Sequence, residues 1–479
     1  MRVEFVRDVK AALGPSGVIT EPEQLRTYEC DGLTGHRVVP ALVALPATTE
    51  EVQAVVRLCA RDGIPFVARG AGTGLSGGAL PVADGVVIAL GRMSRILDVD
   101  LESAQVTVQP GVTNLAVTEA VAPHGFYYAP DPSSQQVCTI GGNVAENSGG
   151  AHCLKHGFTV NHVLEAKVVL SDGELVRLSA GDEGPDLLGA FVGSEGTLGI
   201  ATEITVRVLR VPEAVRTLLA GFDTTAAAGA AVSDCVAARI LPAAIEMMDR
   251  LTIEAAEAAV HPGYPDVGCV LIVELDGLAA QVEEDLAAVE EICRQAGAVE
   301  IRVAADEAER ALLWKGRKSA FAAMGRVSHD YYVQDGVVPR TRLPEVLERI
   351  AQLEREYGLR VGNVFHAGDG NLHPLVLYDA REEGEPERAQ DLAVAILDVC
   401  MEAGGSLTGE HGIGVDKACA MPRMFGPDDL EGMQRLRRGF DPAGLANPGK
   451  VFPTPRLCGE VPGPYRAHPL EKVGLAERF

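Results

Sequence analysis

A chain of 479 residues is too long for a single ordinary hydrophobic core, so two or three packed domains are expected. Aromatic residues make up only 5% of the sequence, and 67 acidic against 42 basic residues give a net charge of −25. A surface of that sign repels a phosphate backbone and offers few rings for stacking on bases, which excludes nucleic acid as an expected partner.

The composition of the N-terminus and of the apolar runs predicts a cytoplasmic protein. The first residues, MRVEFVRDVKAALG, spread charge through the stretch where a secretory signal carries its apolar core. The longest apolar runs, such as VVIAL at 86–90, fall far short of the ~18 residues that predict a membrane span. Ten cysteines are spread singly with no CxxC pair, which indicates reduced thiols and no disulfide scaffold, zinc ribbon or iron–sulfur cluster.

The first domain alternates short helix and strand patterns. TTEEVQAVVRLCARDG opens with a capping box of Thr48 and Glu51 and carries apolar residues at helical spacing. The strand pattern IPFVAR follows it, and GVVIAL, ILDVD and AQVTVQPG predict further strands after a glycine-rich stretch. The last strand pattern, GIATEITVRVLR, ends near Pro212. We therefore predict an α+β domain over residues 1–212.

The order of elements changes after that boundary. Strand and helix patterns alternate up to about residue 300, which predicts one antiparallel sheet with helices on one face. The region 304–455 is predicted to be mostly helical, with a strand-rich interruption at 359–377. The remaining parts are thus a cap or substrate domain, a C-terminal helical segment and a surface tail, at 213–380, 381–455 and 456–479.

A nominal dinucleotide motif lies in RGAGTGLSGGALP at 69–81, where GTGLSG satisfies the GxGxxG pattern. A Rossmann site needs a helix directly after its glycines, and Gly77, Gly78 and Pro81 cannot form the first turn of one. The loop can instead present a row of backbone amides between two strands, a nest for a pyrophosphate, with Arg69 neutralising charge beside it. For this loop taken alone, a tight connection without a ligand is the open alternative.

Two more glycine-rich stretches follow in the same domain. PDPSSQQVCTIGGNVAENSGG at 130–150 sets glycines among Ser, Thr and Asn side chains, which supply short donors to a flat polar ligand. VGSEGTLGIATEITV at 192–206 has spaced glycines that let the chain pass close to a partner. Three such loops in one domain indicate one large ligand that is bound along its length.

Residues with metal-binding and acid–base chemistry lie in the second half of the chain. NVFHAGDGNLHPLV places His366 and His373 on the two arms of a predicted hairpin with GDGN at its tip, so both imidazoles can converge on a metal ion. GSLTGEHGIGVDK adds Glu410 and His411, and a His2Glu set is a common open metal site. Taken singly, each histidine is more often a hydrogen-bonded surface residue, but the glycine-framed contexts together favour the metal site.

A carboxylate-binding group is predicted in LLWKGRKSAF, where the planar guanidinium of Arg317 suits bidentate binding. Lys315, Arg317 and Lys318 can equally form one solvated helix face.

The three glycine-rich motifs resemble the FAD-binding loops of the vanillyl-alcohol-oxidase (PCMH-type) flavoprotein family. The resemblance implies a PCMH-type FAD-binding domain of two subdomains, a ferredoxin-like α+β cap domain, and a C-terminal helical segment that returns to the flavin. No pattern for covalent flavin attachment is present, so dissociable FAD is expected. The residues that the resemblance places at FAD are Arg69, Gly70, Ala71, Gly72, Thr73, Gly74, Ser76, Gly77, Gly78, Pro130, Asp131, Pro132, Ser133, Ser134, Thr139, Gly141, Gly142, Asn143, Ser148, Gly149, Glu195, Gly199, Ile200 and Asn447.

The downstream motifs, together with DYYVQDGVVPR and FDPAGLANPGKVFP, resemble the FAD-linked D-2-hydroxy-acid dehydrogenases and oxidases, which include glycolate oxidase catalytic subunits and D-lactate dehydrogenases. This resemblance implies that Arg317 binds the substrate carboxylate and that His411 is the base. The residues that it implies as ligands of a divalent ion, which would be zinc, manganese or iron, are His366, His373 and Glu410. The ion would polarise the substrate hydroxyl, and the hydrogen on Cα would pass as hydride to the flavin.

The same resemblance bears on substrate and partners. Val333 stands where dicarboxylate-using relatives tend to carry an additional basic residue, so a small monocarboxylate such as glycolate or D-lactate is expected. An iron–sulfur subunit and a second flavin-type subunit are implied as partners, through which the chain would lie peripherally at the inner membrane.

Three alternatives to that interpretation remain, and the second and third belong to other classes of protein. A D-lactate dehydrogenase acting alone needs no partner subunits. A metal-dependent hydrolase leaves the three glycine-rich loops unexplained. A non-catalytic flavin-binding subunit does not account for the intact His411 and Arg317.

Overall fold

The structure is a computed structural model that describes residues 1–454, and the chain divides into two compact units. Unit 1 comprises residues 1–148 and 158–210 together with the described residues from 410 onward. Unit 2 comprises the short segment 149–157 and residues 211–409. The segment 381–409, which the sequence analysis grouped with the C-terminal part, therefore lies in unit 2.

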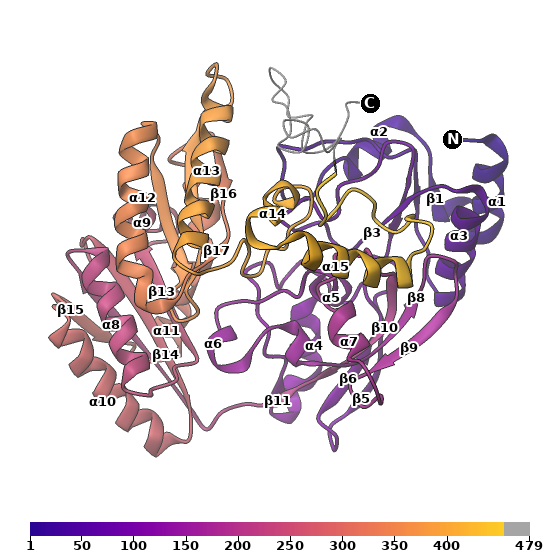
Figure 1. Cartoon of the computed structure of the whole chain (residues 1–479). Helices are drawn as coiled ribbons and strands as arrows, with labels where there is room; N and C mark the ends of the chain where they lie inside the picture. The colour runs from indigo at the N-terminus through magenta and orange to yellow at the C-terminus, as the bar shows by residue number, and fades with distance from the viewer. Residues whose placement is uncertain (455–479) are drawn as a thin grey trace. The chain divides into compact units, whose positions relative to one another are not determined.

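Unit 1 contains two larger sheets and a two-stranded one, and the two larger sheets agree with the predicted two-subdomain α+β fold (Figure 1). Three of the four strands in the first sheet run parallel, and α1 (Val3–Leu13) and α3 (Thr49–Asp62) pack on it. The side chain of Thr48 accepts a hydrogen bond from the Glu51 amide at the start of α3, as the capping box predicts. The strand order is β1 (Val18–Ile19), β2 (Leu42–Ala44), β4 (Val86–Ala89) and β3 (Phe66–Arg69).

The second sheet of unit 1 is antiparallel throughout and is covered on one face by three helices. Its strand order is β5 (Ile96–Asp100), β6 (Gln105–Val108), β10 (Ile200–Arg207), β8 (Val163–Val169) and β9 (Leu175–Ser179). The covering helices are α4 (Asn114–Val121), α5 (Ile140–Glu146) and α7 (Leu187–Phe191). The remaining elements of unit 1 are α2 (Pro22–Leu25), β7 (Phe126–Tyr127), β11 (Leu209–Arg210), α14 (Met421–Met424) and α15 (Pro427–Phe440).

Unit 2 is built on one large antiparallel sheet. Its main path is β15 (Glu300–Val303), β12 (Ala214–Phe222), β14 (Cys269–Gly277), β13 (Ala244–Asp249), β18 (Val361–His366), β19 (Asn371–Leu372) and β17 (Gly336–Val337). Strand β20 (Pro374–Tyr378) pairs with both β18 and β16 (Asp330–Val333). The segment 149–157 contributes one short helix, α6 (Cys153–His156).

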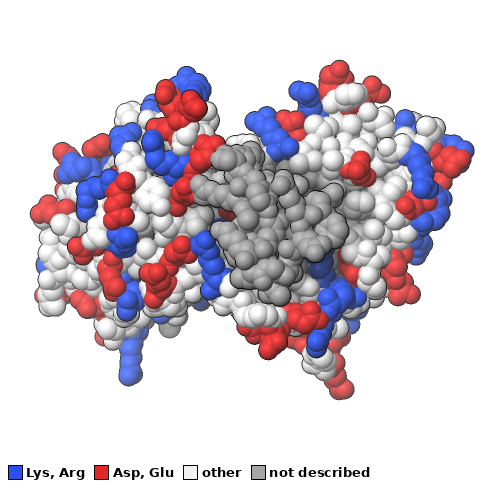
Figure 2. Space-filling model, turned by 45° about the horizontal axis from the view of Figure 1, so that its top comes forward, with Lys and Arg blue, Asp and Glu red and all other residues white. Residues whose placement is uncertain are grey.

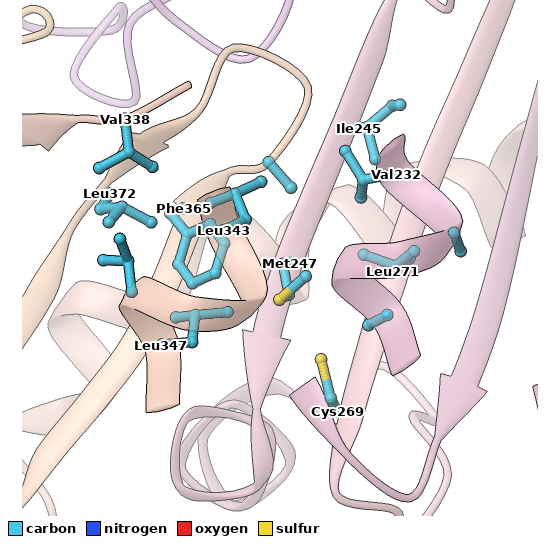
Figure 3. Packing of buried hydrophobic residues seen from close by; sticks show 14 of the residues in the cluster. Val232, Ile245, Met247, Cys269, Leu271, Val338, Leu343, Leu347, Phe365 and Leu372 are labelled. Atoms are coloured by element: carbon cyan, nitrogen blue, oxygen red, sulfur yellow. The ribbon is translucent and has the colours of Figure 1, made fainter. Parts of the chain in front are cut away.

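Helices cover both faces of this sheet, so the prediction of helices on one face is wrong. The residues of β14 divide alternately between two apolar clusters, because its run CVLIVEL is apolar on both faces. One face is covered by α8 (Thr225–Ala237), α10 (Ala279–Gln295), α12 (Leu343–Tyr357) and α13 (Glu385–Glu402). The other face is covered by α9 (Arg250–Val260) and α11 (Glu307–Met324). Figure 3 shows the first cluster, with Val232 and Leu347 facing Leu271 and Met247 of the sheet.

A buried carboxylate on β14 holds the segment 149–157 within unit 2. Glu274 is 2% exposed and accepts hydrogen bonds from Thr217 Oγ1 at 2.7 Å, from Trp314 Nε1 at 2.5 Å and from Arg310 Nε at 2.9 Å. The ring of His152 also lies 3.0 Å from it. Burial alone would raise the pKa of Glu274, but His152 and Arg310 outweigh it and hold that pKa well below its usual range.

Most of the described cysteines are buried free thiols, and charged side chains of both signs lie on the surface. Eight cysteines of the described residues are free thiols, and all but Cys30 are buried. No helix within residues 1–454 is long and apolar enough to cross a membrane. On the face in Figure 2, acidic and basic side chains are interspersed, so the negative charge forms no single patch there.

Replacing Glu274 by Gln should destabilise unit 2 by about 3–5 kcal/mol near pH 7, because the amide group would face the donors of Arg310 and Trp314. The folded-state pKa lies below the unfolded value of about 4.3, so this contribution is present above that pH and is lost as pH falls further. Chemical denaturation at several pH values measures the difference. The control Glu283→Gln, at an exposed ion pair, should cost less than about 1 kcal/mol; equal losses for both would contradict the assignment.

Candidate active site

The glycine-rich loop of unit 1 connects two strands without a helix. Residues 70–85 contain no helical turn, and the strands on either side, β3 and β4, run parallel. This confirms that GTGLSG is not a Rossmann turn. Among the described residues, the amides of Thr73–Gly78 have no acceptor, although Gly77 and Gly78 are buried. The Ser76 hydroxyl is also buried without a described partner.

The side chain of Arg69 packs against this loop at Gly72. Its Nη1 donates a hydrogen bond to the Cys30 carbonyl at 2.8 Å, and its guanidinium lies over the Tyr28 ring at 5.6 Å. A side chain at Gly72, where φ is +72°, would collide with this guanidinium. The close packing explains the glycine, and it gives Arg69 a structural role beside the loop in addition to its predicted charge.

The second glycine-rich stretch meets the first. A Cβ on Gly70 would collide with the Thr139 hydroxyl, so the two loops touch at this point. Thr139 begins α5 by accepting a hydrogen bond from the Gly142 amide at 3.3 Å. Asn143 in the same helix accepts from Asn114 Nδ2 at 2.9 Å. Helix α5 was not predicted from the sequence, because its two glycines are poor helix formers.

The third loop is fastened by the C-terminal segment of unit 1. The carboxylate of Glu195, where φ is +53°, accepts hydrogen bonds from the amides of Ile413 at 2.7 Å and Gly414 at 2.6 Å. The side-chain amide of Asn447 donates to the carbonyls of Gly78 at 2.8 Å and Glu195 at 2.6 Å. Asn447 therefore joins the first loop to the third.

Glu146 is a buried residue of this site that was not predicted from the sequence, although it lies inside the AENSGG motif. It lies against Gly78, and a Cβ on Gly412 would collide with the carboxylates of both Glu146 and Glu195. Burial raises the pKa of Glu146 well above its usual range, and the negative charges of Glu195 and Asp31 raise it further. Burial likewise raises the pKa of Glu195.

The other residues predicted at FAD take the following places. Those in unit 1 lie in the first loop, in the turns before α5, within α5, after it and at the start of β10: Ala71, Gly74, Pro130, Asp131, Pro132, Ser133, Ser134, Gly141, Ser148, Gly199 and Ile200. Gly149 belongs to unit 2. Their contact with FAD stays a prediction.

The two histidines of unit 2 lie together. His366 ends β18 opposite Asn371, and His373 is two residues further on, so the rings share one face of the hairpin. The turn between the strands is 367–370, one residue earlier than predicted. The ring centroids are 5.1 Å apart, and one nitrogen of each ring lies within 4.8 Å of the other. Both side chains are buried.

Glu246, which sequence analysis missed, joins His366 to Arg317. It lies opposite His366 on β13 and is 0% exposed. One oxygen lies 2.8 Å from His366 Nδ1, and the other lies 2.7 Å from Arg317 Nη2. Burial would raise the pKa of Glu246, but His366 and Arg317 hold it below its usual range. A single charge inside the apolar strand AAIEMM was the signal in the sequence.

Arg317 is 2% exposed, which rules out the solvated helix face as its setting, whereas Lys315 is exposed. Its Nη2 approaches Glu246 without the alignment of a hydrogen bond, and neither Nε nor Nη2 has a hydrogen-bond partner among the described residues. These two atoms form one edge of the guanidinium, the edge that binds a carboxylate with two hydrogen bonds.

Asp335 anchors the end of unit 2. This buried carboxylate accepts hydrogen bonds from the Gly409 amide at 3.0 Å and from the Thr408 hydroxyl. It also lies 3.8 Å from His373 Nδ1. Glu410 and His411 are the next residues of the chain and belong to unit 1.

Comparison with known proteins identifies the family. Residues 40–179 match the family model described as FAD binding domain, and residues 211–451 match that of the FAD linked oxidases, C-terminal domain. The chain belongs to the FAD-linked oxidase family. It is therefore a flavoprotein oxidoreductase, which contradicts the alternative of a metal-dependent hydrolase.

Several relatives of this FAD-linked oxidase align over nearly the whole chain. It is 52% identical to the glycolate oxidase subunit GlcD of Escherichia coli (strain K12), over 96% of this chain and 93% of the relative. It is 37% identical to the glycolate oxidase subunit GlcD of Bacillus subtilis (strain 168), over 94% and 97%. A D-lactate dehydrogenase of Anaerostipes hadrus is 35% identical, over 86% and 89%.

Solved structures share the fold of this FAD-linked oxidase. A p-cresol methylhydroxylase with substrate bound aligns with a TM-score of 0.77 at 19% identity, over 94% of this chain and 96% of that chain. An alkyldihydroxyacetonephosphate synthase aligns with a TM-score of 0.74 at 21% identity, over 94% and 85%. These likenesses confirm the predicted PCMH-type fold.

The glycine-rich loops of this FAD-linked oxidase fit the cofactor of its family. Buried amides without acceptors are costly, and an anionic pyrophosphate would satisfy those of the first loop. The buried Ser76 hydroxyl offers a further donor on the same loop.

Replacing Asn447 by Ala should weaken FAD binding about tenfold, because the first and third loops would lose their shared hydrogen bonds. Titration of the apoprotein with FAD, followed by flavin fluorescence, measures the dissociation constant. The exposed Asn161 of the same unit provides the control Asn161→Ala, which should bind FAD normally. An unchanged constant in a folded Asn447→Ala protein would contradict this role.

Proposed function

We propose that this FAD-linked oxidase converts a small D-2-hydroxy acid, glycolate or D-lactate, to the 2-oxo acid. The observation that carries the proposal is the buried guanidinium edge of Arg317, beside Glu246 and the imidazoles of His366 and His373. A carboxylate-binding group beside two metal-binding side chains suits a substrate with adjacent carboxylate and hydroxyl groups. The names of the relatives, glycolate oxidase subunit and D-lactate dehydrogenase, support the same substrate class.

The charges of unit 2 favour a monocarboxylate. Arg317 is the only buried lysine or arginine among the described residues of this unit, so one anionic group finds a buried cationic partner. The other charged groups that the structure places there, Glu246 and Asp335, are carboxylates, and apolar side chains such as Phe321, whose ring lies 5.9 Å from that of His373, offer no charge. A second carboxylate on the substrate would be desolvated without a cation.

The proposed metal ligands are His366, His373 and Glu410, for zinc, manganese or iron. With Nδ1 of His366 facing Glu246, Nε2 is the nitrogen that remains for an ion, which is the usual arrangement of a metal-binding histidine. Asp335 holds Gly409, the residue before Glu410. When bound, the ion would polarise the substrate hydroxyl and lower its pKa.

His411 is proposed as the base that removes the hydroxyl proton. Its loop is held within unit 1, because Glu195 accepts hydrogen bonds from the amides two and three residues further along the chain. FAD, when bound, would accept the hydride from Cα. Arg317 keeps the carboxylate in place during both transfers.

We assign the chain to a glycolate oxidase-type complex, with an iron–sulfur subunit and a second flavin-type subunit as partners, and a cytoplasmic or membrane-peripheral location. The subunit names of the relatives support this assignment. A D-lactate dehydrogenase that acts alone is the second candidate, because relatives of 35% and 32% identity carry that name. Co-purification with partner subunits separates the two.

Anaerobic addition of glycolate or D-lactate should bleach the flavin absorbance of the purified protein. His411→Ala should slow that reduction at least about 100-fold while FAD stays bound, since the base is lost. The control His124→Ala removes an exposed histidine of the same unit and should reduce normally. Stopped-flow absorbance measures the rates. Normal reduction by His411→Ala would exclude it as the base, and an unbleached wild type would exclude the substrates.

Chelation followed by dialysis should suppress turnover, and added zinc, manganese or iron should restore it. His373→Ala should lower the metal content of the folded protein, because one of two adjacent buried imidazoles is removed. Elemental analysis measures the content. An unaffected rate in protein that contains no metal would contradict the metal site.

A further inference from the structure

We propose that Glu246 is a positioning residue that sets the separation between the metal-side imidazole of His366 and the guanidinium of Arg317, and thereby selects 2-hydroxy acids over longer hydroxy acids. The inference rests on the proposed function. It adds to that function a residue which contacts neither the substrate nor the ion.

Glu246 lies on an interior strand of the sheet of unit 2. Its strand, β13, lies between β14 and β18, and Glu246 faces Ile272 on one side and His366 on the other. The side chain is completely buried. Burying a carboxylate in a sheet costs free energy unless cationic or hydrogen-bond-donating groups lie against it, so the fold depends on the partners of Glu246.

The carboxylate of Glu246 contacts both His366 and Arg317. His366 Nδ1 lies 2.8 Å from one oxygen, and Arg317 Nη2 lies 2.7 Å from the other. Both oxygens belong to one rigid planar group, so the imidazole from β18 and the guanidinium from α11 cannot shift independently. Among the described residues, no other carboxylate pairs with Arg317.

The contacts with Glu246 leave other atoms of His366 and Arg317 available to a ligand. With Nδ1 facing Glu246, Nε2 of His366 would remain for an ion, and Nε of Arg317 has no hydrogen-bond partner among the described residues. In a 2-hydroxy acid the hydroxyl and the carboxylate sit on adjacent carbons. The distance between the two anchors therefore has to match that spacing, and Glu246 is the common support of both.

The alternative is that Glu246 only stabilises the sheet. Asp249 provides a control on the same strand, because it is a partly buried carboxylate on β13 that accepts hydrogen bonds from the amides of Thr252 and Asn363 and forms no hydrogen bond or ion pair with His366 or Arg317. Asp249→Asn should lower stability while leaving the KM and the metal affinity of the folded protein unchanged.

The test compares Glu246→Gln, Glu246→Asp and Asp249→Asn as FAD-loaded proteins. For Glu246→Gln we expect a metal affinity lowered about 10- to 100-fold by calorimetric titration with zinc or manganese. We also expect the KM for glycolate or D-lactate to rise at least about tenfold and to stay raised when metal is added to saturation. In Glu246→Asp, the preference for glycolate over 3-hydroxypropanoate should shrink, because the shorter side chain changes the separation of the anchors.

The outcomes separate this inference from the proposed function. Unchanged metal affinity and KM in a folded Glu246→Gln protein would overturn the role of Glu246 while wild-type oxidation of 2-hydroxy acids still stands. Equal changes in Asp249→Asn would also overturn it, since the effect would then be structural. A wild type that oxidises no 2-hydroxy acid would overturn the proposed function itself, whatever the metal titration reports.

Discussion

Two carboxylates buried in the sheet of unit 2 determine how helix α11 lies on it. Glu274 on β14 binds Arg310 and Trp314, and Glu246 on the neighbouring strand β13 pairs with Arg317. The three partners follow one another on α11 at helical spacing of four and three, so they share one face of the helix. A buried carboxylate needs such partners, and this requirement fixes the rotation of α11 about its axis. The same rotation presents Arg317 beside the histidine pair.

Unit 1 depends on a different constraint, the need of buried backbone amides for acceptors. Its first glycine-rich loop has several amides without a described acceptor, and its shape is maintained by side chains around it. Arg69 packs beneath the loop, and Asn447 joins it to the loop of Glu195. A ligand with anionic oxygens would complete this arrangement, which fits the FAD binding domain that the family comparison shows.

The segment that carries Glu410 and His411 is held at both of its ends by carboxylates. Before it, Asp335 binds Gly409 within unit 2, and after it, Glu195 binds Ile413 and Gly414 within unit 1. The two residues for which we propose metal and proton chemistry lie in the chain between Gly409 and Ile413.

Local features of this protein follow from its sequence alone. The capping box at Thr48, the loop without a helix after Arg69, and the histidine hairpin all depend on residues a few positions apart, where glycine, proline and helical spacing act directly. The tertiary structure decided which buried polar groups meet. Glu246 is 120 residues from His366, and Asp335 is 74 residues from Gly409. Such pairs depend on strand order, and an apolar strand such as β14 does not say which helices cover its two faces. Burial makes these contacts decisive, and burial is a property of the packed chain rather than of any short stretch within it.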